Sequence, residues 1–245
     1  MKQVYLSKLA GKPLIEYLEK NGYKIRFVGP SGLSSVQTEP PVDDRISTHP
    51  DIYMCQLGLW ENAGLFIGDS DKLGRRYPDN IIYNGVCTSD FFIHSAPHTS
   101  PDLVMAVMTW RAGLCCSEND LAFINVKQGY TRCSCLPVDD RSFITSDRGI
   151  ARALSLCDCD VLLIEPGHIS LPGYNYGFIG GCGGAVFECS SSEGRFRQKA
   201  IVFNGDLSAH PDFKKICSFI SRRNIKPFYF DSYPLEDIGS ILAVE

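Results

Sequence analysis

The sequence predicts an α/β fold, an αβ propeller with five ββαβ units arranged around a pseudo-fivefold axis. Two observations predict it. The same order of β-rich segment, polar turn, amphipathic helix and apolar run recurs along the 245 residues, and such recurrence is typical of a repeat architecture. One copy is split between the two chain ends, so pairing of the N- and C-terminal strands is expected to close the ring and remove an exposed sheet edge.

Each predicted unit contains a strand that leads into a helix. These strands are short, rich in β-branched or aromatic residues, and stop at a small or polar residue. They are expected at residues 4–7, 65–68, 91–94, 143–146 and 201–204. The helices that follow are expected at residues 13–21, 71–76, 101–112, 147–156 and 211–223. A proline and an acid in the first turn mark two of the helix starts, at Pro101 and Pro211.

A third strand closes each unit, and a further segment opens it. The third strands are apolar runs bounded by charged residues, glycine or proline, which predicts strands covered on both faces. They are expected at residues 24–28, 80–83, 121–125, 161–165 and 226–230, and the opening segments at 51–59, 85–89, 129–138, 173–188 and 237–245. The resulting units are 237–245 with 1–28, then 49–83, 84–126, 127–165 and 172–230.

Composition indicates a single domain over residues 1–245. Hydrophobic residues make up 44% of the chain, enough for a sizeable core. Residues 29–48 are the one long irregular stretch and are expected to form a functional or covering loop. A net charge of −4 gives no basic face for nucleic acid. The start of the chain lacks signal-peptide character and no apolar run could span a bilayer, so a cytoplasmic protein without a membrane partner is expected.

The eleven cysteines indicate neither a metal site nor a disulfide framework. The pairs at 115/116, 133/135 and 157/159 are too closely spaced for zinc knuckles, and the total is odd. Most thiols are therefore expected to be buried and unreactive, packed as small hydrophobic groups. Neither a metal nor a cofactor is predicted.

Polar residues concentrate in the connections between the predicted units. Around a common axis these connections lie on one rim and face a central cavity, and loops on a rigid scaffold often carry binding chemistry. The candidate cavity residues are His49, Asp51, Gln128, Tyr130, Arg132, Tyr174, Asn175, Tyr176, Asp237 and Ser240.

Residues 128–133, 173–181 and 237–242, together with the five-unit pattern, resemble the pentein or guanidino-group-modifying enzyme superfamily, and are closest to an uncharacterised bacterial branch of it. The resemblance covers nearly the whole chain through its architecture. It implies a cysteine that attacks a guanidinium carbon, a histidine that moves protons, and acidic side chains that hold the planar cation.

The nucleophile of that superfamily lies near the C-terminus, where matching its pattern leaves Ser240 or Leu242 at the cysteine position. Cys133 and Cys182 are therefore the candidate displaced nucleophiles. Arg132 is expected to lower the pKa of Cys133, and glycines around Cys182 would admit a ligand closely. The alternatives are a strand cysteine buried beside Cys135 and a crowded, bulged strand at Cys182.

The other candidates divide by chemistry. Asp51 and Asp237 are expected to hold the cation. His49 and His168 are the candidate proton carriers, or alternatively histidines that bond nearby backbone. The tyrosines would stack on a planar ligand or wall the cavity, and these two interpretations are compatible.

Two functions fit these residues. The first is a C–N hydrolase or amidinotransferase-like enzyme acting on a guanidino or amidino small molecule such as an arginine derivative. The second is a non-catalytic protein that binds a small metabolite or a macromolecular partner, as a ribosome-binding initiation factor of the same superfamily does, because fold alone does not fix chemistry. The absence of a cysteine at the C-terminal position separates the two, and the oligomeric state is not indicated.

Overall fold

A computed structural model describes residues 2–29, 42–114, 121–189 and 197–244. Much of the predicted covering loop, residues 30–41, and the 115/116 cysteine pair lie outside the described residues. The strands are β1 (Gln3–Ser7), β2 (Lys24–Val28), β3 (Met54–Leu57), β4 (Gly64–Ile67), β5 (Val86–Cys87), β6 (Phe91–His94), β7 (Ala122–Asn125), β8 (Cys135–Asp139), β9 (Ser142–Thr145), β10 (Asp160–Leu163), β11 (Gly183–Cys189), β12 (Arg197–Phe203), β13 (Lys226–Phe228) and β14 (Leu242–Val244).

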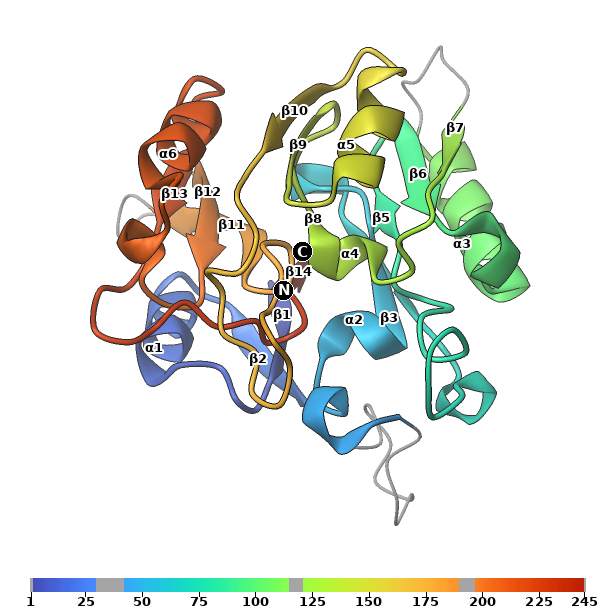
Figure 1. Ribbon diagram of the computed structural model, residues 1–245, viewed down its shortest axis with the longest axis horizontal. Helices are drawn as coiled ribbons and strands as arrows, with labels where there is room; N and C mark the ends of the chain where they lie inside the picture. Colours follow the sequence, from blue (N-terminus) through green and yellow to red (C-terminus); the bar gives the residue numbers. More distant parts are fainter. Residues whose placement is uncertain (1, 30–41, 115–120, 190–196, 245) are drawn as a thin grey trace.

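The α-helices are α1 (Lys12–Lys20), α2 (Pro50–Tyr53), α3 (Pro101–Ala112), α4 (Thr131–Ser134), α5 (Arg148–Ser155) and α6 (Phe213–Ser221). Short 3₁₀ segments are η1 (Asp44–Ile46), η2 (Trp60–Asn62), η3 (Ser70–Lys72), η4 (Ala96–His98) and η5 (Leu207–Ala209). The four longer α-helices α1, α3, α5 and α6 lie at the periphery, whereas α2 and α4 lie near the middle (Figure 1).

Four parallel strand pairs, each joined through a helix, build most of the fold. They are β1–α1–β2, β6–α3–β7, β9–α5–β10 and β12–α6–β13. Helix α5 illustrates why these helices form. Its Ile150 and Leu154 are buried one turn apart, and the carboxylate of Asp147 accepts a hydrogen bond from the Ile150 N–H at 2.8 Å, so the helix is both amphipathic and capped.

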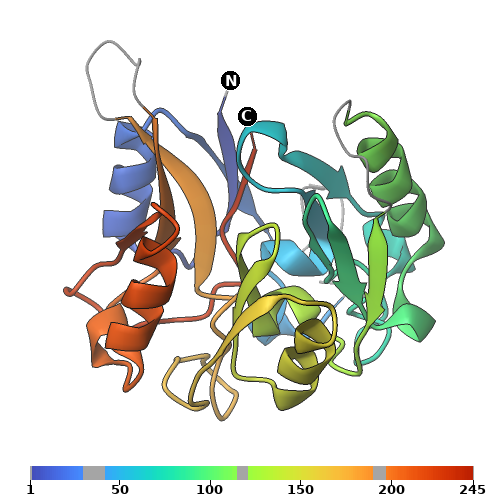
Figure 2. The ribbon, with the colours of Figure 1, turned by 90° about the horizontal axis from the view of Figure 1, so that it is seen from above.

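The predicted five-unit propeller is wrong. The described strands form four small separate sheets, ordered β14-β1-β2, β10-β9-β8, β11-β12-β13 and β4-β3-β5-β6-β7, and none of these sheets closes or curls into a ring. The C-terminal β14 does pair antiparallel with β1, and the two ends of the chain lie side by side (Figure 2). That pairing completes a three-stranded sheet and leaves the edge of β2 unpaired.

The segment 49–83 departs most from the predicted unit. The helix expected at 71–76 is reduced to η3, and residues 80–83 form no strand. Gly74 and Pro78 explain the difference, because both residues disfavour a continuing helix. Without a third strand of its own, this segment pairs through β3 with β5 of the following segment, so two predicted units share one five-stranded sheet.

The third strands are also exposed where full coverage was expected. β2, β7, β10 and β13 are edge strands of their sheets, and Phe27, Phe123 and Leu163 on them are 44–48% exposed. These four apolar runs therefore predicted strands correctly. The prediction that the strands are covered on both faces was wrong, because an edge strand lacks a neighbour on one side. Among the described residues, no helix has the length and apolar character required to cross a membrane.

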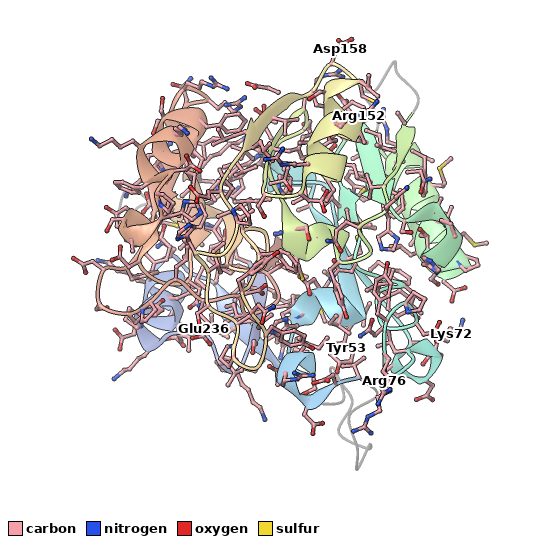
Figure 3. All side chains as sticks on the ribbon, viewed as in Figure 1. Tyr53, Lys72, Arg76, Arg152, Asp158 and Glu236 are labelled. Atoms are coloured by element: carbon pink, nitrogen blue, oxygen red, sulfur yellow. The ribbon has the colours of Figure 1, made fainter. Side chains whose placement is uncertain are left out.

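Short helices hold the candidate site. α2 leads directly into β3, and α4 leads directly into β8, so side chains on both helices are fixed by strands of two different sheets. Side chains fill the space between these elements, while the labelled Lys72, Arg152 and Asp158 lie at the periphery (Figure 3).

Candidate functional site

A cavity of about 290 Å³ lies where loops from several sheets meet. Its deepest groups are a thiol, an imidazole and a carboxyl group, from Cys133, His49 and Asp237, each no more than 4% exposed. Tyr174 and Tyr176, about 40% exposed, stand at its mouth. The described lining consists of Ile46, His49, Ile52, Tyr130, Cys133, Leu171, Tyr174, Asn175, Tyr176, Phe178 and Asp237.

The carboxyl group of Asp51 lies behind the thiol. Cys133 Sγ donates to Asp51 Oδ2 at 2.9 Å, and Ser240 Oγ donates to the same oxygen at 2.6 Å. The other oxygen, Asp51 Oδ1, is buried and makes no hydrogen bond with any described residue. A buried acceptor of this kind is costly unless a ligand or water uses it. Asp51 is therefore placed to take the thiol proton of Cys133.

His49 and Asp237 face each other across the cavity wall. His49 Nδ1 lies 3.9 Å from Asp237 Oδ1, and His49 Nε2 is buried without a hydrogen-bond partner in the described part of the chain. Asp237 is fixed by backbone donors, the N–H of Gly239 at 3.0 Å and the N–H of Phe178 at 2.9 Å. Its position is thus independent of any basic side chain.

Asn84 joins the two short helices beneath the cavity. Its side-chain oxygen accepts from the N–H of Arg132 at 2.8 Å. Its amide nitrogen donates to the Asp51 carbonyl at 3.0 Å and lies 3.6 Å from Cys133 Sγ. Asn84 therefore holds α2 and α4 in register and contacts the sulfur directly.

Glycines let the backbone approach the acidic groups. A Cβ at Gly181 would lie 2.0 Å from Asp237 Oδ1, and one at Gly239 would lie 2.1 Å from the Cβ of His49. Gly239 and Ser240 both have positive φ, 72° and 77°, and a non-glycine residue in that region is strained. This turn carries the Ser240 hydroxyl onto Asp51.

Burial sets the ionisation of these groups. Loss of water lowers the pKa of His49 to about 4, so the imidazole is neutral at pH 7. The same effect raises the pKa of Asp237 to about 6, against the lowering effect of its two backbone donors. Burial also raises the pKa of Asp51, against the lowering effect of His49. Burial thus leaves both carboxyl groups poorly stabilised as anions.

The thiol of Cys133 is protonated at rest. Burial raises its pKa well above the ordinary value, and the nearby charges of Asp51 and Asp237 raise it further. The lowering expected from Arg132 is therefore outweighed by burial and by the two acids. The alternative of a buried strand cysteine is also wrong, because Cys133 lies on α4 and only Cys135 begins the strand.

Arg132 is buried beside the acids without pairing with them. Its guanidinium group donates to the carbonyls of Gly180, at 2.8 Å, and Gly183, at 3.2 Å. Burial lowers its pKa, and the charge of Asp51 raises it. If Asp51 and Asp237 are both ionised, their two negative charges exceed the single positive charge of Arg132, and the cluster is negative overall.

Three candidates from the sequence lie elsewhere. Gln128 accepts from the Tyr130 N–H at 3.2 Å and lies 3.5 Å from Asp147, so it fixes its own loop. Cys182 is fully buried, with its thiol donating to the Ile179 carbonyl at 3.3 Å. The side chain of His168 is 40% exposed and lies 3.7 Å from Glu165. None of these three is among the described residues that line the cavity, and their functional roles stay predictions.

The remaining candidates converge on the cavity or on its support. His49, Cys133, Asp237 and the three tyrosines line it with Asn175, while Asp51, Arg132 and Ser240 support it from behind. Sequence reasoning missed Asn84 as a site residue, although Asn84 stands in one of the connections that it singled out. It also missed the apolar part of the wall, formed by Ile46, Ile52, Leu171 and Phe178.

Within the described ranges, no group of three or more His, Cys, Asp or Glu side chains could hold a metal ion. Nine cysteines in these ranges are free thiols, five of them buried. The ionisable side chains among the described residues that line the cavity are the thiol of Cys133, the imidazole of His49, the carboxyl group of Asp237 and three tyrosines.

Residues 12–242 match a family model described as "Family of unknown function (DUF6873)", so the chain belongs to that family. No curated protein and no solved structure matched the chain. The resemblance to the guanidino-group-modifying superfamily therefore stays a prediction, and a function has to be argued from the cavity itself.

Proposed function

We propose that the protein is an enzyme that breaks a C–N bond of a small planar cation of guanidinium or amidinium type, either by hydrolysis or by transfer of the amidino group. Cys133 is the nucleophile. One observation carries the proposal. The Cys133 thiol donates to the Asp51 carboxylate at 2.9 Å on the wall of a cavity that also presents His49 and Asp237. A nucleophile, a base next to it and a further proton carrier are the usual parts of covalent catalysis.

The charge of the cavity favours a cation. Two buried carboxyl groups, Asp51 and Asp237, face one buried guanidinium group, which bonds to backbone carbonyls. Buried charges are stable when paired, and a planar N–H donor pairs well with carboxylates through charge-assisted hydrogen bonds. Asp51 lies behind the thiol and adds negative charge to the cavity without lining it, and its Oδ1 makes no hydrogen bond with any described residue.

Cation binding would also activate the thiol. Burial, together with the negative field of Asp51 and Asp237, keeps Cys133 protonated. A bound cation offsets that field and favours the thiolate, with the proton passing to Asp51. The thiol is therefore unreactive until the substrate arrives.

The chemical steps then follow from the groups present. The thiolate adds to the electrophilic carbon, a C–S bond forms and one C–N bond breaks, and the leaving nitrogen takes the proton that Asp51 received. Water next adds to the thiouronium carbon with His49 Nε2 accepting its proton. The C–S bond breaks, the proton on His49 returns to sulfur, and the hydroxyl proton of the urea product passes through solvent to the released amine or ammonia. For a guanidinium substrate the net reaction is guanidinium plus water to a urea and an ammonium ion.

Labelling with 2-chloroacetamidine tests the proposal, with neutral 2-chloroacetamide as the matched control. Because hydrogen bonds to charged groups are strong, we expect the amidine to alkylate Cys133 about tenfold or more faster than the amide. Rates are normalised to Cys189, which is exposed, and the modified residue is mapped by mass spectrometry. Equal normalised rates for the two probes, or an amidine that leaves Cys133 unmodified, would contradict the proposal.

The raised pKa of Cys133 favours a second candidate, a non-catalytic protein that binds the same kind of cation. Cation binding that survives the Cys133→Ala substitution, with no product from any guanidine or amidine supplied to the wild-type protein, would support this second function. Release of an amine or ammonia by the wild-type protein alone would support the enzyme.

A further inference from the structure

The outer part of the cavity differs chemically from its base. The acidic groups and the thiol are almost fully buried, whereas the wall between them and the mouth is apolar. It consists of Ile46, Ile52, Leu171, Phe178 and the ring of Tyr130, and Tyr174, Asn175 and Tyr176 form the mouth. A ligand that reaches the base therefore leaves its remaining atoms against aliphatic and aromatic surface.

No lysine or arginine is among the described residues that line the cavity. Arg45, which precedes Ile46, is a basic group beside the mouth, where it contacts Tyr174. Its Nε and Nη2 donate to the Asp43 carboxylate at 2.8 and 2.6 Å, and its Nη1 donates to the Gly173 carbonyl at 2.8 Å. Its guanidinium group also stacks on Tyr174, 4.4 Å from the ring centroid.

These contacts commit Arg45 to the protein. They join η1 to the loop that carries Tyr174, and Gly173 has the positive φ of 85° that this close approach requires. A Cβ at Gly173 would lie 2.4 Å from the Arg45 side chain. Arg45 thus acts as a structural fastener, meaning that it links η1 to the loop at the mouth, and its N–H groups donate to Asp43 and Gly173.

We infer that the substrate is a monocation with an uncharged, apolar tail, and that a guanidino amino acid such as arginine is disfavoured. An α-carboxylate in this wall would lose water without meeting a basic side chain, which is unfavourable. An alkyl or aryl tail gains from the same surface. A cavity of about 290 Å³ holds about ten water-sized groups, enough for the planar head and a tail of about six atoms.

This inference rests on the proposed binding of a planar cation, so the head and the tail are tested separately. Isothermal titration calorimetry is performed on Cys133→Ser, with wild-type protein in parallel, and with butylguanidine, butylurea and arginine as ligands. The comparison with butylurea tests the cationic head. The comparison with arginine, which shares the head and adds a charged α-amino acid group, tests the tail.

We expect butylguanidine to bind about tenfold or more tightly than either other ligand. Arginine binding as tightly as butylguanidine would overturn the inference about the tail and leave the cationic head standing. Butylurea binding as tightly as butylguanidine would overturn the cationic head. If no guanidine binds either protein, both proposals fail.

A gain of binding gives an independent test. Asn175 is exposed and lines the mouth, so Asn175→Arg adds the missing basic group without disturbing the core. We expect Asn175→Arg to raise the ratio of arginine affinity to butylguanidine affinity about tenfold over the ratio in Asn175→Gln, which is the matched control without the charge. An unchanged ratio in Asn175→Arg would contradict the inference that the missing cation causes the discrimination.

Discussion

Two regions of the molecule contain a histidine next to an aspartate, and their electrostatics are opposite. At the cavity, Asp51 and Asp237 are bonded by a thiol, a hydroxyl and backbone N–H groups. In the second region, beside His210, Asp212 accepts from the Lys215 ammonium group at 2.6 Å and from the Glu165 N–H at 2.8 Å.

The pKa values of the carboxyl groups differ between the two regions, whereas the pKa values of the two histidines shift in the same direction. Burial lowers the pKa of both His49 and His210. The pKa of Asp212 is lowered by Lys215, whereas burial raises the pKa of Asp237 to about 6. Asp212 pairs with a lysine, whereas Asp237 forms no ion pair with a lysine or arginine among the described residues. The proposed cation site depends on this difference.

The largest expected effect follows removal of the thiol. Cys133→Ala should abolish amidine labelling at that site and lower any turnover by about a thousandfold or more, because the nucleophile is lost. Cys182→Ala is the matched control, since Cys182 is equally buried and bonds to a backbone carbonyl. It should retain labelling of Cys133. Equal loss of function in both variants would show that burial, and not nucleophilicity, links the cysteines to activity.

Removing one carboxylate at the cavity is expected to have the next largest effect. Asp237→Asn should weaken butylguanidine binding roughly thirtyfold or more, because a buried charge pair loses one partner. Asp212→Asn, in the compensated region, should leave the affinity unchanged. Titration calorimetry measures both, with circular dichroism to verify folding, and a weaker affinity in Asp212→Asn alone would reverse the comparison.

Stability against pH sharpens the comparison further. The folded pKa of Asp237 is raised to about 6, so the folded state holds the extra proton and stability falls as pH rises from about 4 to 6. The folded pKa of His49 is lowered to about 4, so stability rises with pH from about 4 to 6.5. In the wild-type protein the two slopes oppose each other.

Single substitutions should expose each slope. In Asp237→Asn only the contribution of His49 remains. The free energy of unfolding of this variant, relative to wild type, should therefore rise as the pH increases from about 4 to 6, by up to about 1.4 kcal/mol per pH unit. His49→Gln should show the opposite slope relative to wild type. Asp212, whose pKa is lowered, acts below this range. Urea unfolding at several pH values measures the slopes, and parallel curves for all variants would contradict the assigned burial effects.

The smallest expected effect concerns the mouth. Arg45→Ala removes the contacts with Asp43, Gly173 and Tyr174 and should weaken butylguanidine binding about threefold, because the mouth is less ordered. Lys215→Ala, which removes the ion pair of the other region, should leave the affinity unchanged. Tighter binding of arginine in Arg45→Ala than in wild type would contradict the role of Arg45 as a fastener.

Local structure followed from the sequence better than its assembly did. Helix α3 begins at Pro101 and ends at Ala112 as predicted, because proline and an acid open it and buried residues recur on one face. The sharing of one sheet by β3 and β5 depends on contacts between segments that periodicity does not record. The repeated local pattern therefore predicted most of the helices and strands correctly but predicted the pairing of strands into sheets wrongly.

The site was predictable to a similar degree. The polar connections between strands identified His49, Cys133, Asp237 and the acid behind them. The directions of Gln128 and Cys182 depend on how their own backbone turns, which residue type does not specify. Asn84 carried no chemical signal beyond its place in a connection, and its role appears only from its bonds to both short helices.

The most direct test of the uncompensated acidic cavity is the number of protons exchanged when a cation binds. Titration calorimetry of butylguanidine at pH 6, in buffers of different ionisation enthalpy, measures it. With the pKa of Asp237 near 6, we predict release of about half a proton from wild-type protein and less from Asp237→Asn. Binding with no proton release, or with the same release in both proteins, would contradict the central claim.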